Sequence, residues 1–145
     1  MHIQNSSIYF AASIRGGRQE IDSYKKLIKH LSKYGSVLTE HIALPSTFEE
    51  DQSDIFIHDR DVTWLKSCDI VIADVTVPSL GVGYEIAFAV QLQKPVLCLN
   101  NIEKNPNLSA MISGCQKIVM GNYSSIKNAC DTIDSFIIKK TSPVP

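Results

Sequence analysis

Residues 69–93 read DIVIADVTVPSLGVGYEIAFAVQLQ, and this stretch decides the fold. Of its first seven residues, Asp69 to Val75, all but the two aspartates are apolar, which is typical of a strand buried on both faces of a sheet. A loop that contains Pro78 follows, and the apolar residues from Gly81 to Gln93 predict a helix. A buried strand that leads into a helix is half of a βαβ unit and favours a parallel sheet.

The same alternation of strand and helix extends along the chain in both directions. Strands are predicted at residues 8–12, 36–42, 69–75, 95–99 and 117–120, and helices at residues 19–34, 54–67, 81–93 and 124–138. Gly35 is predicted to end the first helix in the left-handed conformation. The pattern predicts an α/β fold: one doubly wound, Rossmann-like, five-stranded parallel sheet in the flavodoxin-type order 2-1-3-4-5, with helices on both faces.

Length and charge limit the classes of function. The 145 residues are expected to form a single domain with a loose tail at 141–145. A net charge of -1 gives no broad positive surface for a nucleic-acid polymer or an anionic membrane. No signal peptide or apolar membrane span is evident, so we expect a protein of the cytoplasm or the nucleus.

The cysteines are widely spaced along the chain and do not form the CxxC pairs of zinc sites. We interpret Cys68, Cys98, Cys115 and Cys130 as reduced residues that pack among apolar neighbours. No metal or other cofactor is expected.

Two loops carry the most unusual residues. In such a sheet the ligand lies beyond the carboxyl ends of the strands where strand order reverses, which here means the loops after the first and third strands. The first loop, residues 13–18 (SIRGGR), combines a hydroxyl, two guanidinium groups and two glycines. The second places Ser79, Gly81 and Gly83 at a helix N-terminus. Together they predict a site for a small phosphate, although glycines that only serve packing and a surface role for Arg15 remain alternatives.

Carboxylates near these loops are candidates for catalysis. Glu85 lies early in the helix after Gly81, where the macrodipole favours an ionised nucleophile; the alternative is an ordinary first-turn glutamate. Asp59 and Asp61 on the preceding helix point to different faces. One of the two is expected to face the crevice as a general acid whose pKa is raised by Glu85.

Other polar residues near the crevice carry weaker signals. His41 follows the second strand and is placed to reach the crevice, although a histidine at a strand end is often structural. The acidic cluster at residues 49–51 is interpreted as solvated. His58 with the nearby carboxylates lacks the HxH or HExxH spacing of a metal site.

Several strings resemble one enzyme family. YFAASIRGGR at residues 9–18, LTEH at 38–41 and PSLGVGYE at 78–85, with Asp61 ahead of Trp64-Leu65, closely resemble the 2′-deoxynucleoside 5′-phosphate N-hydrolases of the nucleoside 2-deoxyribosyltransferase-like superfamily. The resemblance runs from about residue 8 to residue 99 and resumes at residues 108–112. Ala12 stands where the family has a glycine.

The resemblance implies a hydrolase that cleaves the N-glycosidic bond of a 2′-deoxynucleoside 5′-monophosphate to a free base and 2-deoxyribose 5-phosphate. It implies that Glu85 attacks C1′ to form a covalent sugar ester, that Asp61 protonates the leaving base and that Tyr9 orders the carboxylates. The substrate-binding residues implied in this way are Ser13, Ile14, Arg15, Gly16, His41, Ser79, Gly81, Ser109 and Met111. Ser109 is expected to act from the second subunit of a homodimer with shared active sites.

The chemistry fits these roles, because a retaining glycosidase uses two carboxyl groups about 5 Å apart, one ionised and one protonated. Two alternatives stay open. A nucleoside deoxyribosyltransferase forms the same intermediate but passes the sugar to another base, and a non-catalytic nucleotide sensor could share the fold. The sequence also leaves open whether the base is a purine, a pyrimidine or a modified pyrimidine.

Overall fold

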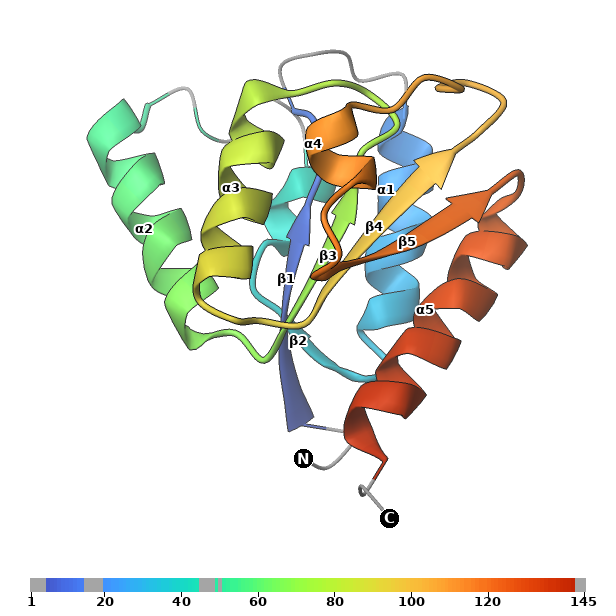
Figure 1. Ribbon diagram of the computed structural model, residues 1–145. Coiled ribbons are helices and arrows are strands. Elements are labelled where there is room, and N and C mark those ends of the chain that lie inside the picture. The colour runs from blue at the N-terminus through green and yellow to red at the C-terminus, as the bar shows by residue number, and fades with distance from the viewer. Residues whose placement is uncertain (1–4, 15–19, 45–48, 50, 143–145) are drawn as a thin grey trace.

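The protein contains one parallel sheet with helices on both faces (Figure 1). The computed structural model describes residues 5–14, 20–44, 49 and 51–142. The strands are β1 (Ser6–Ala11), β2 (Gly35–Val37), β3 (Ile70–Asp74), β4 (Val96–Asn101) and β5 (Ile118–Tyr123). They lie in the order β2-β1-β3-β4-β5, and every neighbouring pair is parallel. The predicted fold class and strand order are therefore confirmed.

The helices form two layers. They are α1 (Ile21–Leu31), α2 (Asp54–Ser67), α3 (Leu80–Gln91), the short α4 (Ala110–Ser113) and α5 (Ile126–Thr141), with a 3-10 helix, η3, at Glu40–Ala43. Helices α1 and α5 cover one face of the sheet, whereas α2 and α3 cover the other (Figure 1). Among the described residues, no helix is both long and apolar enough to span a membrane.

Strand β1 shows how the sheet positions side chains. Ile8 and Phe10 pack in the core beneath α1 and α5, while Tyr9 and Ala11 pack in the core beneath α2 and α3. Successive side chains of a strand point to opposite faces, so this alternation follows from the backbone. It brings the Tyr9 hydroxyl to the side of the sheet on which α2 and α3 lie.

The second strand is shorter than predicted. Residues 36–42 were expected to form a strand, but β2 ends at Val37 and η3 begins at Glu40. The side chain of Thr39 explains the early end, because its Oγ1 accepts a hydrogen bond from Phe10 N at 2.9 Å and donates one to Phe10 O at 2.6 Å. A side chain thus satisfies the backbone groups of β1 and releases the following residues from the sheet.

The interpretation of Gly35 was wrong. Helix α1 ends at Leu31 with Ser32 as its cap, so Gly35 is the first residue of β2 and not the terminator of the helix. A Cβ atom on Gly35 would lie 1.9 Å from Ser6 O in the neighbouring strand. Glycine is needed here because the two backbones approach closely.

Helix α2 has the bounds that the sequence predicted. Ser53 caps its first turn by accepting a hydrogen bond from Phe56 N at 3.1 Å. At its other end Lys94 Nζ donates to Lys66 O at 2.9 Å and to Cys68 O at 2.8 Å. Both ends of the helix are therefore fixed, and with them the places of its polar side chains.

All four cysteines are free, and Cys68 and Cys98 are buried. Burial raises the pKa of the Cys68 thiol to about 11 and that of Cys98 to about 12. These two thiols behave as apolar packing groups at neutral pH.

Candidate functional site

The centre of the site is a hydrogen bond between the sheet and α3. Tyr9 OH donates to Glu85 Oε1 at 2.5 Å. The Tyr9 ring is buried, with 1% of the residue exposed, so its hydroxyl is held in one place. Burial and the adjacent Glu85 carboxylate raise the pKa of Tyr9, which keeps the phenol protonated as a donor.

Glu85 is less acidic than the sequence suggested. Burial raises the pKa of Glu85 to about 7; the hydrogen bond from Tyr9 opposes this rise, and the carboxylates of Asp61 and Glu49 add to it. Burial therefore outweighs the expected effect of the helix macrodipole, although a pKa of about 7 still leaves a substantial ionised fraction of Glu85 at neutral pH. Helix α3 begins at Leu80, which places Glu85 in the second turn, where the macrodipole is weak and desolvation dominates.

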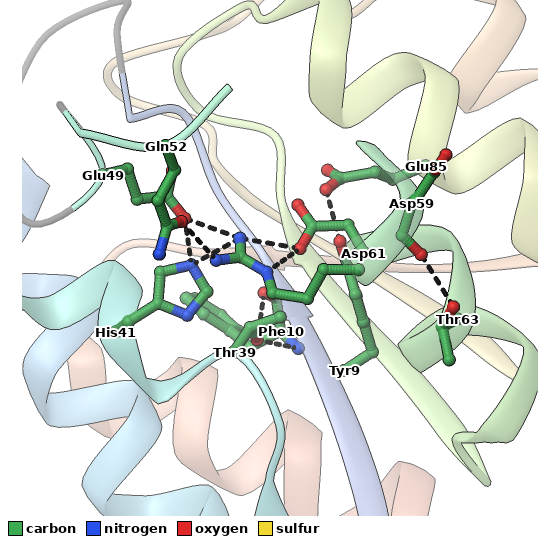
Figure 2. A network of polar contacts seen from close by, with 11 residues as sticks. Tyr9, Phe10, Thr39, His41, Glu49, Gln52, Asp59, Asp61, Thr63 and Glu85 are labelled. Carbon is green, nitrogen blue, oxygen red and sulfur yellow. Dashed lines mark hydrogen bonds and ion pairs between the residues drawn. The ribbon is translucent and has the colours of Figure 1, made fainter. Parts of the chain in front are cut away.

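Asp61, and not Asp59, faces Glu85. Figure 2 shows the polar ends of Tyr9, Asp61 and Glu85 turned toward one region, with Asp59 directed away from it. The Asp59 side chain is 72% exposed and contacts His58 Nδ1 at 2.9 Å. Burial raises the pKa of Asp61, and the hydrogen bond from Arg60 opposes the rise. Burial is thus the largest cause for Asp61, and the repulsion between the two carboxylates contributes to the raised pKa of Glu85.

Arg60 connects Asp61 to the segment before α2. Its Nε donates to Asp61 Oδ1 at 2.9 Å, and its Nη2 lies 2.8 Å from the same oxygen. On the other side Nη2 donates to Glu49 Oε1 at 2.6 Å, and Nη1 donates to Gln52 Oε1 at 3.2 Å. His41 Nε2 lies 2.9 Å from the same Glu49 oxygen. His41 Nε2 also lies 3.3 Å from Arg60 Nη2, so four residues surround the guanidinium group.

The aromatic ring of Trp64 also packs against the Arg60 guanidinium group. The Arg60 guanidinium carbon lies 4.7 Å from the centre of the Trp64 ring, and the centre of the His41 ring lies 5.7 Å from that of Trp64. Burial, and then the charge of Arg60, lower the pKa of His41. His41 is therefore neutral at physiological pH and already bonded within this network.

Sequence reasoning missed Glu49 and Arg60. The acidic residues at 49–51 were interpreted as solvated, yet only 18% of the Glu49 side chain is exposed. Arg60 was not singled out, because adjacent helical residues generally point in different directions, so helical spacing gives no sign that its side chain contacts Asp61. The sequence did offer one signal for this contact: Arg60 and Asp61 are adjacent, and the half-buried Trp64 follows one turn later.

The candidate phosphate loops are only partly described. Ser13 is buried at the end of β1 and Ile14 packs against the core, whereas Arg15 and Gly16 lie outside the described residues. Ser79 caps α3, and its Oγ accepts a hydrogen bond from Val82 N at 3.3 Å.

The glycines at the start of α3 are not required by packing. A Cβ atom at Gly81 would meet only Ser79 Oγ, at 3.8 Å, and one at Gly83 would meet nothing within 4 Å. Open space therefore lies over the N-terminal turn of α3, where backbone N–H groups lack helical partners.

Ser109 and Met111 lie on the other side of α3. Ser109 caps α4 by accepting a hydrogen bond from Met111 N at 3.3 Å, and Met111 is 83% exposed. Both line a mostly apolar groove of about 570 Å³ together with Ser79 and Leu80. Tyr9, Asp61 and Glu85 do not line this groove. Within one chain, Ser109 is thus brought near Ser79 and not to the carboxylates.

No group of three or more His, Cys, Asp or Glu among the described residues is arranged to hold a metal ion. The chemistry available at the site is that of two carboxyl groups in unequal environments, a tyrosine donor and a fixed cation. Such a set suits general acid and nucleophilic catalysis at an acetal-like carbon.

Glu85→Gln is expected to stabilise the protein in alkaline solution. The folded pKa of about 7 lies above the ordinary 4.5, so the unfolded chain ionises first and stability falls as pH rises through this window. Glutamine does not ionise and still accepts the Tyr9 hydrogen bond. Urea unfolding near pH 8 should show a gain of at most about 3 kcal/mol, which shrinks near pH 5. A gain that is equal at both pH values would contradict the assigned pKa.

Comparisons with known proteins point to one family of enzymes. A family model described as nucleoside 2-deoxyribosyltransferase matches residues 8–129. A protein of Trichoplax adhaerens named 2′-deoxynucleoside 5′-phosphate N-hydrolase 1 is 43% identical over 140 residues, which cover 94% of this chain and 97% of that protein. The mouse 5-hydroxymethyl-dUMP N-hydrolase is 50% identical over 112 residues, 74% of this chain and 65% of that enzyme.

A solved structure supports the fold. The CMP N-glycosidase of Clostridium botulinum superposes with a TM-score of 0.67 at 22% identity, covering 90% of this chain and 98% of that one. At this identity the likeness concerns the arrangement of strands and helices alone.

Proposed function

The chain belongs to the nucleoside 2-deoxyribosyltransferase family, and we propose that it is an enzyme that hydrolyses the N-glycosidic bond of 2′-deoxynucleoside 5′-monophosphates. The products are a free base and 2-deoxyribose 5-phosphate. The observation that carries the proposal is the set of Tyr9, Asp61 and Glu85, three polar side chains from three elements that meet on one side of the sheet. Relatives named as N-hydrolases of deoxynucleotides support this choice of reaction.

The reaction proceeds by two displacements. Glu85, oriented by Tyr9, attacks C1′ and forms a sugar ester, while Asp61 gives its proton to the departing base. Asp61, now ionised, removes a proton from water, which attacks C1′ and releases Glu85. The raised pKa values of both carboxyl groups let the pair hold a proton at neutral pH, with Asp61 protonated in the productive form.

A turnover screen tests the proposed function. All common ribonucleoside and deoxynucleoside 5′-monophosphates would be incubated with the protein, and free base and sugar phosphate would both be measured. We expect equal amounts of the two products from deoxynucleotides, and slower release from ribonucleotides because a 2′-hydroxyl opposes the developing oxocarbenium charge. Transfer of the sugar to an added base would indicate a deoxyribosyltransferase, and tight binding without base release would indicate a sensor.

The 5′-phosphate is held, in this proposal, by the loop after β1 and by the N-terminus of α3. Ser13, Arg15 and Gly16 supply the first part; Ser79 and Gly81 supply the second. The open space over Gly81 supports this assignment. Binding energy from a phosphate beside the reacting carbon orients the sugar for attack.

Arg15→Ala should remove much of the preference for nucleotides over nucleosides. The guanidinium has a charge to hold only in the phosphorylated substrate, so we expect kcat/KM for the nucleotide to fall by about tenfold to a hundredfold. The value for the nucleoside should change little. A variant that discriminates as strongly as the parent would show that Arg15 does not bind the phosphate.

We further propose that the groove between α3 and α4 is covered by a second copy of the chain. Leu80 is 97% exposed and Met111 83% exposed at its edge. Large apolar side chains gathered in this way are typical of an interface. In a two-fold dimer the partner's Ser109 would complete the phosphate site, as the resemblance implies.

Leu80→Glu should therefore shift the protein toward monomers. Burying the new carboxylate at the interface is costly, so light scattering should show a lower mass at micromolar concentration, with reduced turnover. Ile138→Glu is the matched control, because Ile138 is 52% exposed on α5, away from the groove. A parent protein that is monomeric and fully active at high dilution would refute the dimer.

A further inference from the structure

One carboxyl oxygen of Asp61 is fixed and the other is left open. Both Nε and Nη2 of Arg60 contact Oδ1. Among the described residues, Oδ2 accepts no hydrogen bond from the protein. A general acid must present one oxygen, with its proton, to the leaving group. The contact from Arg60 fixes which oxygen that is.

Arg60 is itself held firmly. Glu49 and Gln52 bind its far side, the Trp64 ring lies against it, and only 14% of its side chain is exposed. A planar guanidinium group bound on both edges has little freedom to rotate. The orientation of Asp61 therefore depends on residues that precede α2.

Arg60 is also shared between two acids. Among the described side chains that face Asp61, the carboxyl groups are those of Glu49 and Glu85, and Arg60 is the only cation. Tyr9 remains a neutral phenol, and His41 is neutral because its pKa is lowered by burial. The charge of Arg60 thus stabilises Glu49 and ionised Asp61 at the same time.

We propose that Arg60 is a positioning residue for Asp61, and that Glu49 limits the hold of Arg60 on Asp61 by sharing its charge. Without Glu49 the guanidinium would serve Asp61 alone and keep it ionised, which is unsuitable for an acid. Without Arg60 the carboxyl group would keep its proton more tightly but lose its orientation. The two residues bias Asp61 in opposite directions. The consequence of this arrangement for catalysis rests on the proposed function.

The titration of Asp61 tests, without any assay of activity, whether Arg60 and Glu49 shift its pKa in opposite directions. The intact protein would be labelled with carbon-13 at aspartate carboxyl groups, and the Asp61 signal identified by its absence in Asp61→Asn. We expect Arg60→Gln to raise the pKa of Asp61, because the opposing cation is gone, and Glu49→Gln to lower it. Lys66→Gln, which removes an exposed cation from the same helix, is the control and should leave the pKa unchanged.

Kinetics tests the positioning role. In Arg60→Gln we expect kcat to fall roughly tenfold or more with little change in KM, and the alkaline limb of the pH profile to move to higher pH. In Glu49→Gln this limb should move to lower pH. A rise in KM with unchanged kcat would overturn the proposal, because Arg60 would then be binding substrate.

The two proposals fail in distinguishable ways. If the parent cleaves no nucleotide, the proposed function is wrong, while the titration still decides how Arg60 and Glu49 act on Asp61. If the parent is active but both variants shift the pKa of Asp61 in the same direction, or not at all, this inference is wrong and the function stands. Should Arg60→Gln fail to fold, Glu49→Gln alone tests the sign of the shift.

Discussion

Glu85→Gln is expected to lower kcat by at least about a thousandfold, because the amide cannot act as the nucleophile at C1′. The variant should still bind deoxynucleotide, since neither phosphate loop is changed. Its side-chain amide would keep an oxygen that accepts the hydrogen bond from Tyr9, so the geometry of the site is preserved. Steady-state turnover and equilibrium binding of the same nucleotide would be measured side by side.

A matched control separates the nucleophile from a general effect of charge. Glu103→Gln removes an exposed carboxylate at the end of β4 and should leave turnover unchanged. If Glu85→Gln retains near-normal turnover, the proposed double displacement is wrong. Loss of binding together with turnover would instead assign Glu85 to the holding of substrate.

Asp61→Asn is expected to slow the release of natural bases by about a hundredfold to ten-thousandfold, the usual range for loss of a general acid. The loss should depend on the leaving group. A substrate whose leaving group needs no proton, such as a nitrophenyl 2-deoxyribosyl 5-phosphate, should be cleaved almost as fast by the variant as by the parent in the first step. Burst kinetics with both substrates would measure this difference.

Asp59→Asn is the control for Asp61, because it lies on the same helix but is exposed and directed away from Glu85. We expect it to retain full activity. Equal losses in the two variants would contradict the assignment of the acid.

The sheet could be predicted because its central strands are buried on both faces and therefore mostly apolar, as β3 and β4 are up to their polar last residues. Hydrogen bonds from single side chains could not be predicted from that pattern. Residues 36–42 were predicted as one strand, but the Thr39 hydroxyl ends the pairing with β1. Gly35 likewise follows a helical segment, yet its role depends on Ser6, which is distant in sequence.

The candidate site likewise has features that the sequence could predict and features that it could not. Glu85 was a candidate because it follows the glycine-bearing loop at the start of a helix, whereas only the resemblance to the N-hydrolases selected Asp61 over Asp59. The acidities of Glu85 and Asp61 could not be predicted, since desolvation depends on how α2, α3 and β1 pack together. The contact between Glu49 and Arg60 could not be predicted, because it joins an irregular segment to a helix and no sequence periodicity indicates such a pair.

The most direct test of the central claim is to trap the sugar on Glu85. A deoxynucleotide analogue with a 2′-fluorine slows breakdown of a glycosyl ester, so mass spectrometry of the digested protein should find the sugar phosphate on the peptide that contains Tyr84 and Glu85. The account predicts one adduct per active site, formed as the base is released. Release of the base with no adduct and with inversion at C1′, or an adduct on Asp61, would contradict it.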